Sequence, residues 1–455
     1  MVSIQHVLQR IKADLTQVLS QEHLARVCRE AGVTWRNRKL NPVTTIYVCL
    51  LQLLHGNAAM TDLPRLSGQA FTPGAYCQAR QRLPLAALRR LLHETGTAVQ
   101  ERAPGNGLWH GQRTFLIDGS SCSMPDTPAL RRHFGQPTGQ KPGCGFPVAH
   151  LLVLFDAGTG RLRDVLVSPW RIHDLTRVAE LHRHLQPGDV LLGDRAFCSY
   201  AHLALLWQQG VFVVLRMHQK QIVDFRPHRP AARNAQEPGR PRSLWLARLG
   251  SHDQLVLWLR PATVSRTMTS EQHAALPAFL LVRELRYRVT TPGFRTRAVT
   301  LATTLWDEQR YPATDLAALY GTRWQVESNL RHLKQTLGLN VLKSRTVAGV
   351  EKEIVVFGLV YNLVRAAMLQ AAAAQGVPAE RISFVDALRY LRWPLAPDAA
   401  RCADRPGGVC PLVVNPLRPG RFEPRVRKRR PPEYPLMTQP RRTLRKALRR
   451  KHVAA

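Results

Sequence analysis

The sequence predicts an α/β fold in which a mixed β-sheet core carries a β-rich insertion, with a helical N-terminal domain before it and a basic tail after it. Three observations predict this: helical apolar periodicity before residue 109, short β-branched runs after it, and a tail dominated by Lys and Arg. The chain has 455 residues, 45% of them hydrophobic, which is enough for two or three domains with their own cores.

The N-terminal domain is predicted to cover residues 1–108 and to be helical. Apolar residues recur at helical spacing through Val43–Leu54 and again through Leu83–Leu92. Between these stretches Thr72, which precedes a proline, is a typical helix start, and Gly68 is a typical turn residue. This spacing indicates a helix-turn-helix, a motif that places one helix in the DNA major groove.

The first part of the core is predicted to cover residues 109–216. The expected strands are Thr114–Asp118, Val148–Asp156, Arg163–Ser168, Val190–Gly193 and Val211–Leu215, with helices over Asp174–Leu185 and Ser199–Gln209. Three strands, a helix, a strand, a helix and a strand form an RNase H-like order of elements.

The remaining chain is predicted to form four further segments. Residues 217–310 contain short β-type runs between Pro-, Gly- and Arg-rich turns, which indicates a β-rich insertion. Residues 311–375 return to the core, and 376–417 form a helical and Pro-rich C-terminal segment. Residues 418–455 are a basic tail, which we expect to be disordered because blocks of like charge repel.

An amphipathic helix is predicted between Pro312 and Gly338. At about 100° per residue, one polar face holds Tyr320, Arg323, Glu327, Arg331 and Lys334, and the adjacent apolar face holds Leu319, Val326, Leu330, Leu333 and Leu337. Thr314 and Asp315 are expected to cap the start of this helix, and Gly338 to end it.

Two aspartates stand at the carboxyl ends of predicted strands. Asp118 ends the run T-F-L-I-D-G-S, and Asp194 ends the run V-L-L-G-D-R-A-F. Taken singly, an Asp at a strand end is usually a turn former, and a Glu between Arg and Lys is usually a solvated ion-pair partner. Together with Glu327 the two aspartates suggest a site for hard divalent cations, because Mg²⁺ prefers oxygen ligands and serves in-line phosphoryl chemistry.

The spacing of the polar face carries a family resemblance. Tyr320, Arg323, Glu327 and Lys334 are separated by two, three and six residues, which resembles the Y-R-E-K motif of the insertion sequence 4 family of DDE transposases. Asp118 and Asp194 resemble that family's first and second catalytic aspartates in order and context. The segments C-R-E-A-G-V-T-W-R-N-R-K-L-N-P and A-Y-C-Q-A-R-Q-R-L-P also resemble its N-terminal domain.

The resemblance implies a site and a reaction. It implies that Asp118, Asp194 and Glu327 are catalytic and bind two Mg²⁺ ions, for which Mn²⁺ can substitute. It also implies a DNA-binding set made of Tyr320, Arg323, Lys334, Trp324 and Arg331, with stacking on an extruded base and plain packing both open for Trp324. The expected activity is cutting at element ends and joining them to target DNA, by a homodimer on double-stranded DNA with terminal inverted repeats.

The net positive charge of the chain is consistent with binding to DNA. Two alternatives to the transposase function stay open. Sixty-five Lys and Arg against 31 Asp and Glu give a formal charge of +34, which favours binding to polyanions with a steep dependence on salt. One alternative is a domesticated DNA-binding protein without cleavage. The other is a non-mobile RNase H-like nuclease, which needs the same acids but not the Y-R-E-K residues.

The cysteine pattern and the hydropathy of the sequence help to predict the cellular compartment of the protein. The eight cysteines include no C-x-x-C pair and are typical of reduced thiols. The apolar stretch Ile354–Ala374 is interrupted by Asn362, Arg365 and Gln370, which favours a buried helix over a membrane span. No secretory leader is apparent, so we expect a cytoplasmic, bacterial-type protein that is nucleoid-associated when bound to DNA.

Overall fold

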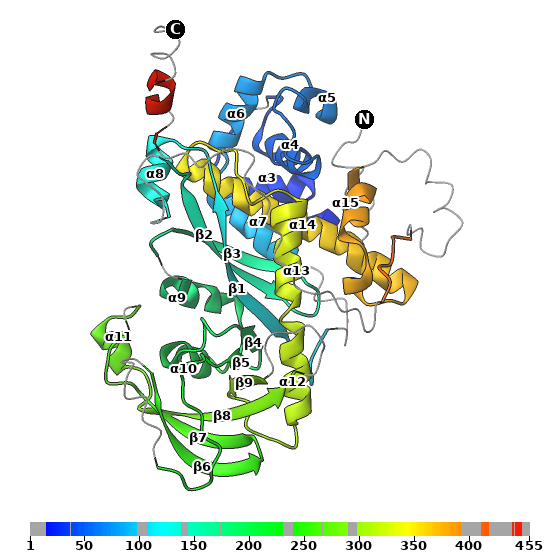
Figure 1. Ribbon diagram of the computed structural model, residues 1–455. Helices are drawn as coiled ribbons and strands as arrows, with labels where there is room; N and C mark the ends of the chain where they lie inside the picture. Colours follow the sequence, from blue (N-terminus) through cyan, green and yellow to red (C-terminus); the bar gives the residue numbers. More distant parts are fainter. Residues whose placement is uncertain are drawn as a thin grey trace.

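The computed structural model describes residues 15–36, 38–97, 107–137, 144–172, 174–230, 240–265, 267–289, 298–392, 411–417, 439–440 and 442–447. Figure 1 shows N-terminal helices at one end of the molecule, a β-sheet through its middle and a group of strands at the other end. Most of the predicted tail lies outside the described residues, but residues 442–447 form a short exposed helical segment.

The N-terminal region is helical, as predicted. Its helices are α2 (Leu15–Val18), α3 (Gln21–Glu30), α4 (Pro42–Leu54), α5 (Leu63–Ser67), α6 (Pro73–Arg82) and α7 (Leu85–Thr97). Thr72 caps α6 by accepting a hydrogen bond from the Ala75 N–H, and Gly68 ends α5 at a φ of +68°. The expected α5–turn–α6 unit is therefore present, although α5 has only 5 residues.

One mixed sheet of nine strands forms the centre of the protein, in the order β3-β2-β1-β4-β5-β9-β8-β7-β6. The strands are β1 (Thr114–Ser123), β2 (Val148–Asp156), β3 (Leu162–Pro169), β4 (Val190–Gly193), β5 (Phe212–Arg216), β6 (Arg242–Gly250), β7 (Asp253–Leu259), β8 (Phe279–Arg288) and β9 (Ala298–Thr303). β4 runs parallel to β1 and β5, and the other pairs are antiparallel. The inserted strands β6–β9 extend the core sheet, since β9 pairs directly with β5.

Shorter helices flank the sheet: α8 (Pro128–Phe134), α9 (Asp174–Arg177), the 3₁₀ helix η2 (Val178–His184), α10 (Tyr200–Gln208) and α11 (Ser270–Ala274). The helix predicted over Asp174–Leu185 is thus one α-turn followed by a 3₁₀ segment. β1 also continues past Asp118, because its pairing with β2 persists to Ser123 opposite Val148. Asp118 therefore lies inside a strand and not at its end, which corrects the prediction.

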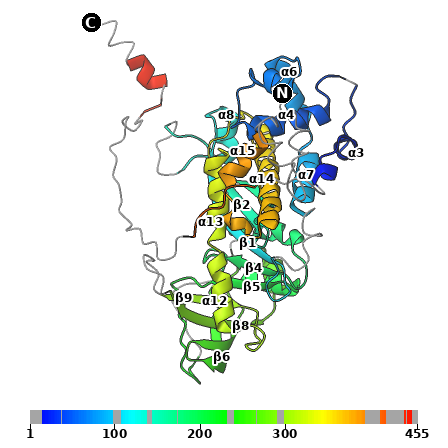
Figure 2. The same cartoon turned by 90° about the vertical axis from the view of Figure 1, so that its right-hand side faces the viewer.

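The predicted continuous helix between Pro312 and Gly338 is interrupted. It consists of α12 (Ala313–Thr322), α13 (Gln325–Arg331) and the π-helical turn η3 (His332–Thr336), and Figures 1 and 2 show α12 and α13 following one another in one column. At the break Arg323 N–H bonds to Tyr320 O and Trp324 N–H to Gly321 O, the tighter i to i+3 pattern. Pro312 occupies the N-cap without a side-chain cap bond, so the predicted cap is wrong.

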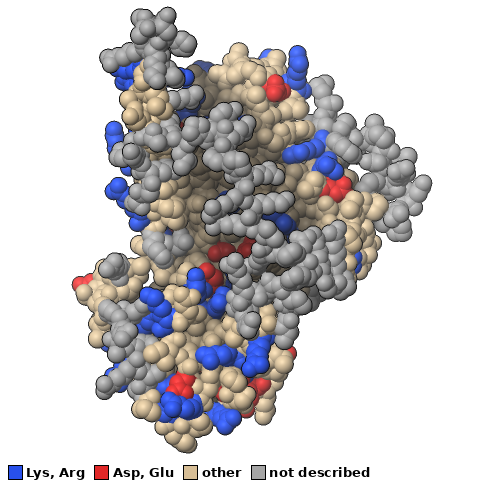
Figure 3. Space-filling model, viewed as in Figure 1, with Lys and Arg blue, Asp and Glu red and all other residues tan. Residues whose placement is uncertain are grey.

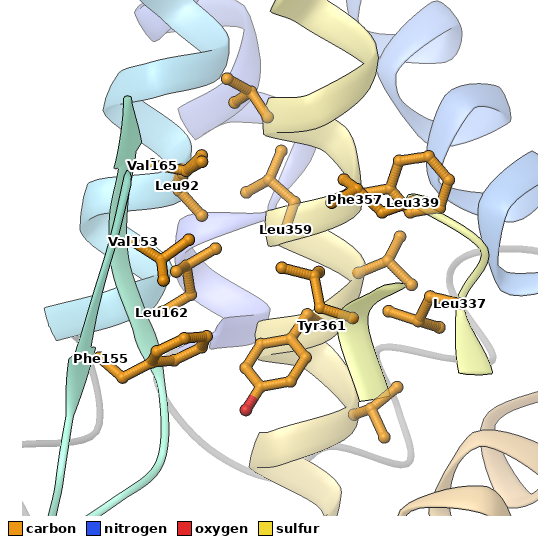
Figure 4. Close-up of a cluster of buried hydrophobic side chains, with 14 of the residues drawn as sticks. Leu92, Val153, Phe155, Leu162, Val165, Leu337, Leu339, Phe357, Leu359 and Tyr361 are labelled. Carbon is orange, nitrogen blue, oxygen red and sulfur yellow. The ribbon is translucent and has the colours of Figure 1, made fainter. Parts of the chain in front are cut away.

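The core is built around the long helix α14 (Val347–Gln375), which is followed by the 3₁₀ turn η4 (Ala379–Arg381) and α15 (Phe384–Arg392). Figure 4 shows Phe357, Leu359 and Tyr361 of α14 among Leu92 of α7 and apolar side chains of β2 and β3. α14 is long and apolar enough to cross a membrane, but 89% of its most apolar window is buried inside the protein. The predicted buried helix is confirmed.

Polar groups on α14 are satisfied inside the core. The Asn362 side chain accepts from the Leu162 N–H at 2.9 Å and donates to the Leu162 carbonyl at 2.9 Å. Arg365 donates to the Thr159 carbonyl at 2.5 Å. Buried polar groups are tolerated when they are hydrogen-bonded, and these bonds tie α14 to the turn between β2 and β3. The six described cysteines are all free.

Candidate active site

Strand register brings the two predicted aspartates together. The parallel pairing of β1 with β4 ends at Leu116 opposite Leu192, and each aspartate lies two residues beyond that pair. Leu116 and Leu192 both face the core that contains α14. Because side chains two residues apart share a face of a strand, Asp118 faces the same side, on which α13 packs against β1.

Backbone N–H groups orient both carboxylates. Gly119 N–H donates to Asp118 Oδ1 at 2.8 Å, and Ala196 N–H donates to Asp194 Oδ1 at 2.8 Å. Such bonds hold one oxygen of each carboxylate and leave the other for a ligand. The Asp118 side chain is 19% exposed, so the site lies at the edge of the core and is reached by solvent.

The third carboxylate comes from the helical side. Glu327 lies in the first turn of α13, and its side chain is 43% exposed. The helix is anchored on the sheet by Val326, Leu330 and Leu333, which are buried as the apolar stripe predicted. Glu327 is thus presented from a buried support toward the face that carries Asp118.

Arg323 lies between the strand and helix carboxylates. Its Nη2 donates to Glu327 Oε1 at 3.4 Å, and its Nη1 is 4.0 Å from Asp118 Oδ2. Burial, with added contributions from the negative charges of Asp194 and Glu327, raises the pKa of Asp118 to about 6, although the Gly119 N–H and Arg323 oppose this. Asp118 is therefore within electrostatic reach of both Asp194 and Glu327.

The donor chemistry of this site suits a hard divalent cation, because Asp118 is influenced by the carboxylates of Asp194 and Glu327 and all three offer oxygen ligands. Within the described part of the chain, no three His, Cys, Asp or Glu side chains are already arranged closely enough to form a complete metal site. The fit therefore rests on the type and mutual influence of the donors.

Tyr320 departs from the predicted polar face. Its side chain is 7% exposed and packs with the core, and the Arg323 guanidinium lies 5.9 Å from its ring. Burial raises the pKa of Tyr320 above its ordinary value. The break after Thr322 changes the angular positions of the side chains that follow. Because the predicted polar face assumes one continuous helix, it places Tyr320 wrongly relative to Glu327.

The other predicted DNA-binding residues differ in their surroundings. Lys334 donates from Nζ to Ser120 Oγ at 3.0 Å. Trp324 is 50% exposed, and Arg331 is exposed at the last residue of α13. Ser120 was missed from the sequence, although its position two residues after Asp118 in a strand is a signal that alternation provides.

Arg216 and Tyr287 were also missed. Both influence the pKa of Tyr320 and so lie near the site, at the end of β5 and on β8. No local pattern marks them, because they come from strands far away in the sequence. On the face seen in Figure 3, blue Lys and Arg side chains outnumber the red acidic ones, as the formal charge of +34 leads one to expect.

The geometry is that of a nucleic-acid enzyme with a carboxylate site on a mixed sheet. Residues 109–363 match the family described as "Transposase DDE domain", a stretch that is more than half of the chain and contains all three acids. The chain belongs to this family and is a DDE transposase. The predicted resemblance to the insertion sequence 4 family is confirmed, and divalent-metal dependence is general to DDE transposases.

Two named relatives are transposases, and one of them aligns with nearly the whole chain. The sequence is 26% identical over 455 residues to the transposase InsG for insertion sequence element IS4 of Escherichia coli (strain K12), covering 96% of both chains. It is 29% identical over 182 residues to the putative transposase InsZ of the same organism, covering 39% of this chain and 57% of the other. A piggyBac transposase synaptic complex with hairpin DNA aligns at 12% identity over 90% and 83% of the chains, with a TM-score of 0.40 that is too low for inference.

Proposed function

We propose that this transposase cuts DNA at the ends of its own element and joins them to target DNA with Asp118, Asp194 and Glu327 as its catalytic and metal-binding residues. The observation that carries the proposal is the β1–β4 register, which sets both aspartates two residues past one pair on the face where α13 presents Glu327. The raised pKa of Asp118 supports it, since the negative charges of Asp194 and Glu327 contribute to that shift after burial, its largest cause.

Two Mg²⁺ ions are the proposed cofactors, with Mn²⁺ able to substitute. Asp118 and Asp194 would share them and Glu327 would hold one of them. When bound, such ions supply Lewis-acid stabilisation and a more nucleophilic water or 3′-hydroxyl. The protein's own part is to orient the carboxylates, and the N–H groups of Gly119 and Ala196 each hold one oxygen of an aspartate.

The cations next to the acids are proposed to hold the DNA. Arg323 and Lys334 would bind phosphates flanking the cut, because guanidinium and ammonium groups form charge-assisted hydrogen bonds that keep the reacting groups in line. The Tyr320 ring would pack against the Arg323 guanidinium and help to hold its orientation. Arg331 adds positive charge, and Trp324, whose side chain is 50% exposed, would stack on a base.

The same proposal includes an RNase H-like catalytic core and a separate role for each of the other segments. The order β3-β2-β1-β4-β5, with only β4 parallel to its neighbours, supports an RNase H-like core over 109–216 and 311–375. Residues 1–108 would bind the terminal inverted repeats, 217–310 would be the insertion, and 376–417 and 418–455 the C-terminal segment and basic tail. A homodimer would pair two ends, in the cytoplasm and on the nucleoid, where a chain of charge +34 meets DNA.

A cleavage assay tests the proposal. A plasmid carrying the gene's native flanking DNA is incubated with wild type, Glu327→Ala or the control Glu308→Ala, which replaces an exposed glutamate outside the site. We expect cuts at the flanking repeats with Mg²⁺ but not with EDTA. Glu327→Ala should lose these cuts and keep DNA binding, whereas Glu308→Ala should cut like wild type.

Three results would contradict this assignment. Binding without cutting by wild type would favour a DNA-binding protein that no longer cleaves. Cutting at positions unrelated to the repeats would favour a general nuclease. Full cutting by Glu327→Ala would remove Glu327 from the site.

A further inference from the structure

Lys334 is held by a strand on the opposite side of the site. Its Nζ donates to Ser120 Oγ at 3.0 Å, across 214 positions of sequence, and its side chain is partly buried. A helix lysine is ordinarily a mobile, solvated cation whose flexible stem has many rotamers. Here part of that freedom is already lost before any DNA is bound.

Ser120 lies on the same face of β1 as Asp118, two residues further along. Two residues of a strand span about 7 Å. The Lys334 ammonium is therefore held on the face of β1 that carries Asp118, two strand positions further along. Cys122, the following residue on this face, is buried in the core, so Ser120 is the last polar position before the apolar interior.

The backbone around Lys334 is fastened to the same strand. Lys334 lies in the π-helical turn η3, in which Leu337 N–H reaches His332 O at 2.9 Å, and single π-turns within helices are frequent at functional sites. Beyond the turn, Ser123 N–H donates to Asn340 O at 3.0 Å. β1 thus holds this segment both at its backbone and at the Lys334 side chain.

We propose that Ser120 is a positioning residue, which holds the Lys334 ammonium on the Asp118 face of β1, preorganised for the phosphate beside the cut. This inference rests on the proposed function. Lys has three donors and Ser120 accepts one, so two remain for phosphate oxygens. A group fixed in its binding orientation loses less entropy when the DNA arrives, and a misplacement of about 1 Å costs rate.

The test is a double-mutant cycle on single-turnover cleavage of a duplex that carries the element's end. The variants are Ser120→Ala, Ser120→Thr, Lys334→Ala and the Ser120→Ala, Lys334→Ala pair. Ser121→Ala is the matched control, because Ser121 is the neighbouring strand residue on the opposite face. End-binding affinity and thermal stability are measured for each variant, so that folding defects are recognised.

We expect Ser120→Ala to slow cleavage about tenfold with end-binding affinity changed less than about twofold, as for one lost hydrogen bond to a charged group. Ser120→Thr keeps the hydroxyl on a strand-compatible side chain and should restore the rate to within about threefold of wild type. With Lys334 absent, Ser120→Ala should have no further effect. A full tenfold effect in the Lys334→Ala background, or a wild-type rate for Ser120→Ala, would overturn the inference.

A second readout does not depend on cleavage. Labelling of Lys334 by an amine-reactive reagent, followed by peptide mass spectrometry, should be several-fold faster in Ser120→Ala than in wild type or Ser121→Ala. Equal labelling in all three would overturn the inference even if wild type cuts normally. Absence of cutting by wild type, with faster labelling in Ser120→Ala, would contradict the proposed function and leave the Ser120–Lys334 contact established.

Discussion

The strand side and the helix side of the active site are built differently. On the strand side, Asp118 lies within a ladder that pairs with β2 on one side and ends its pairing with β4 on the other, and its side chain is 19% exposed. On the helix side, Glu327 follows a break in the backbone and is 43% exposed. Backbone hydrogen bonds thus orient the aspartates, whereas Glu327 is placed by the apolar packing of its helix and by a side-chain contact with Arg323.

The largest predicted effect is on the rate of cleavage, and it tests whether the strand side and the helix side are both needed for cleavage. Asp194→Asn and Glu327→Gln should each lower the rate of end cleavage by about 10³-fold or more, because each removes an anionic ligand from a site that stabilises developing charge. Single-turnover cleavage with Mg²⁺ measures this. If Glu327→Gln keeps more than about a tenth of the wild-type rate, the carboxylate on the helix side is not needed for cleavage. Only the strand side would then supply essential acids.

Stability should separate the two sides, because burial on the strand side raises the pKa of Asp118. Burial and neighbouring carboxylates raise the pKa from 3.8 to about 6, so the folded protein binds this proton more tightly than the unfolded chain does. The ionised side chain is therefore unfavourable above pH 6, and Asp118→Asn should stabilise the metal-free protein there by roughly 2 kcal/mol, allowing for partial exposure.

The sign of this effect sets its pH window. The advantage of Asp118→Asn should be complete above pH 6, shrink between pH 6 and 4, and vanish below the unfolded pKa of 3.8. Denaturant unfolding in EDTA at several pH values measures it, and Glu327→Gln is the control that should change stability little. A loss of stability in Asp118→Asn at pH 7.5 would show that the carboxylate is paired more favourably than we infer.

The strand side was also the more predictable one from the sequence. The predicted bounds of β2 and β4 match the observed ones residue for residue, because apolar β-branched runs with clear turns are local signals. β1 extends further than predicted because its polar G-S-S-C-S end is paired by β2, which is a tertiary effect. The three acids were found by their position in such runs and by a family motif.

The helix side was only partly predictable. The apolar stripe of α13 is confirmed, but the break at Arg323–Trp324 and the π-turn are not visible in a period of 3.6 residues. The contacts of Lys334 with Ser120 and of Arg323 with Asp118 join residues more than 200 positions apart, and no local pattern encodes such contacts.

Arg323 links the two sides, and its removal should sharpen the comparison. Its charge lowers the pKa of Asp118 against the burial that raises it. Arg323→Gln should therefore raise that pKa and move the acid limb of the cleavage profile upward by about one pH unit. Arg331→Gln, which removes an exposed charge from the end of α13, should leave the limb unmoved. An unchanged limb in Arg323→Gln would show that Arg323 does not act on Asp118 during the reaction.

The smallest predicted stability effect concerns Trp324, at the break itself. Because its side chain is 50% exposed, Trp324→Ala should change the free energy of unfolding by less than about 1 kcal/mol, far below the about 3–5 kcal/mol typical of a core aromatic. If Trp324 stacks on a base, affinity for the element's end should nevertheless fall about tenfold.

Trp207→Ala is the matched control for Trp324, since Trp207 is 43% exposed on α10. It should match Trp324→Ala in stability and keep full affinity for the element's end. Equal end binding by both variants would favour plain packing for Trp324. If Trp324→Ala instead lowers the free energy of unfolding by about 3–5 kcal/mol, as for a core aromatic, the Trp324 side chain stabilises the break. The helix side would then be anchored at both ends, like the strand side.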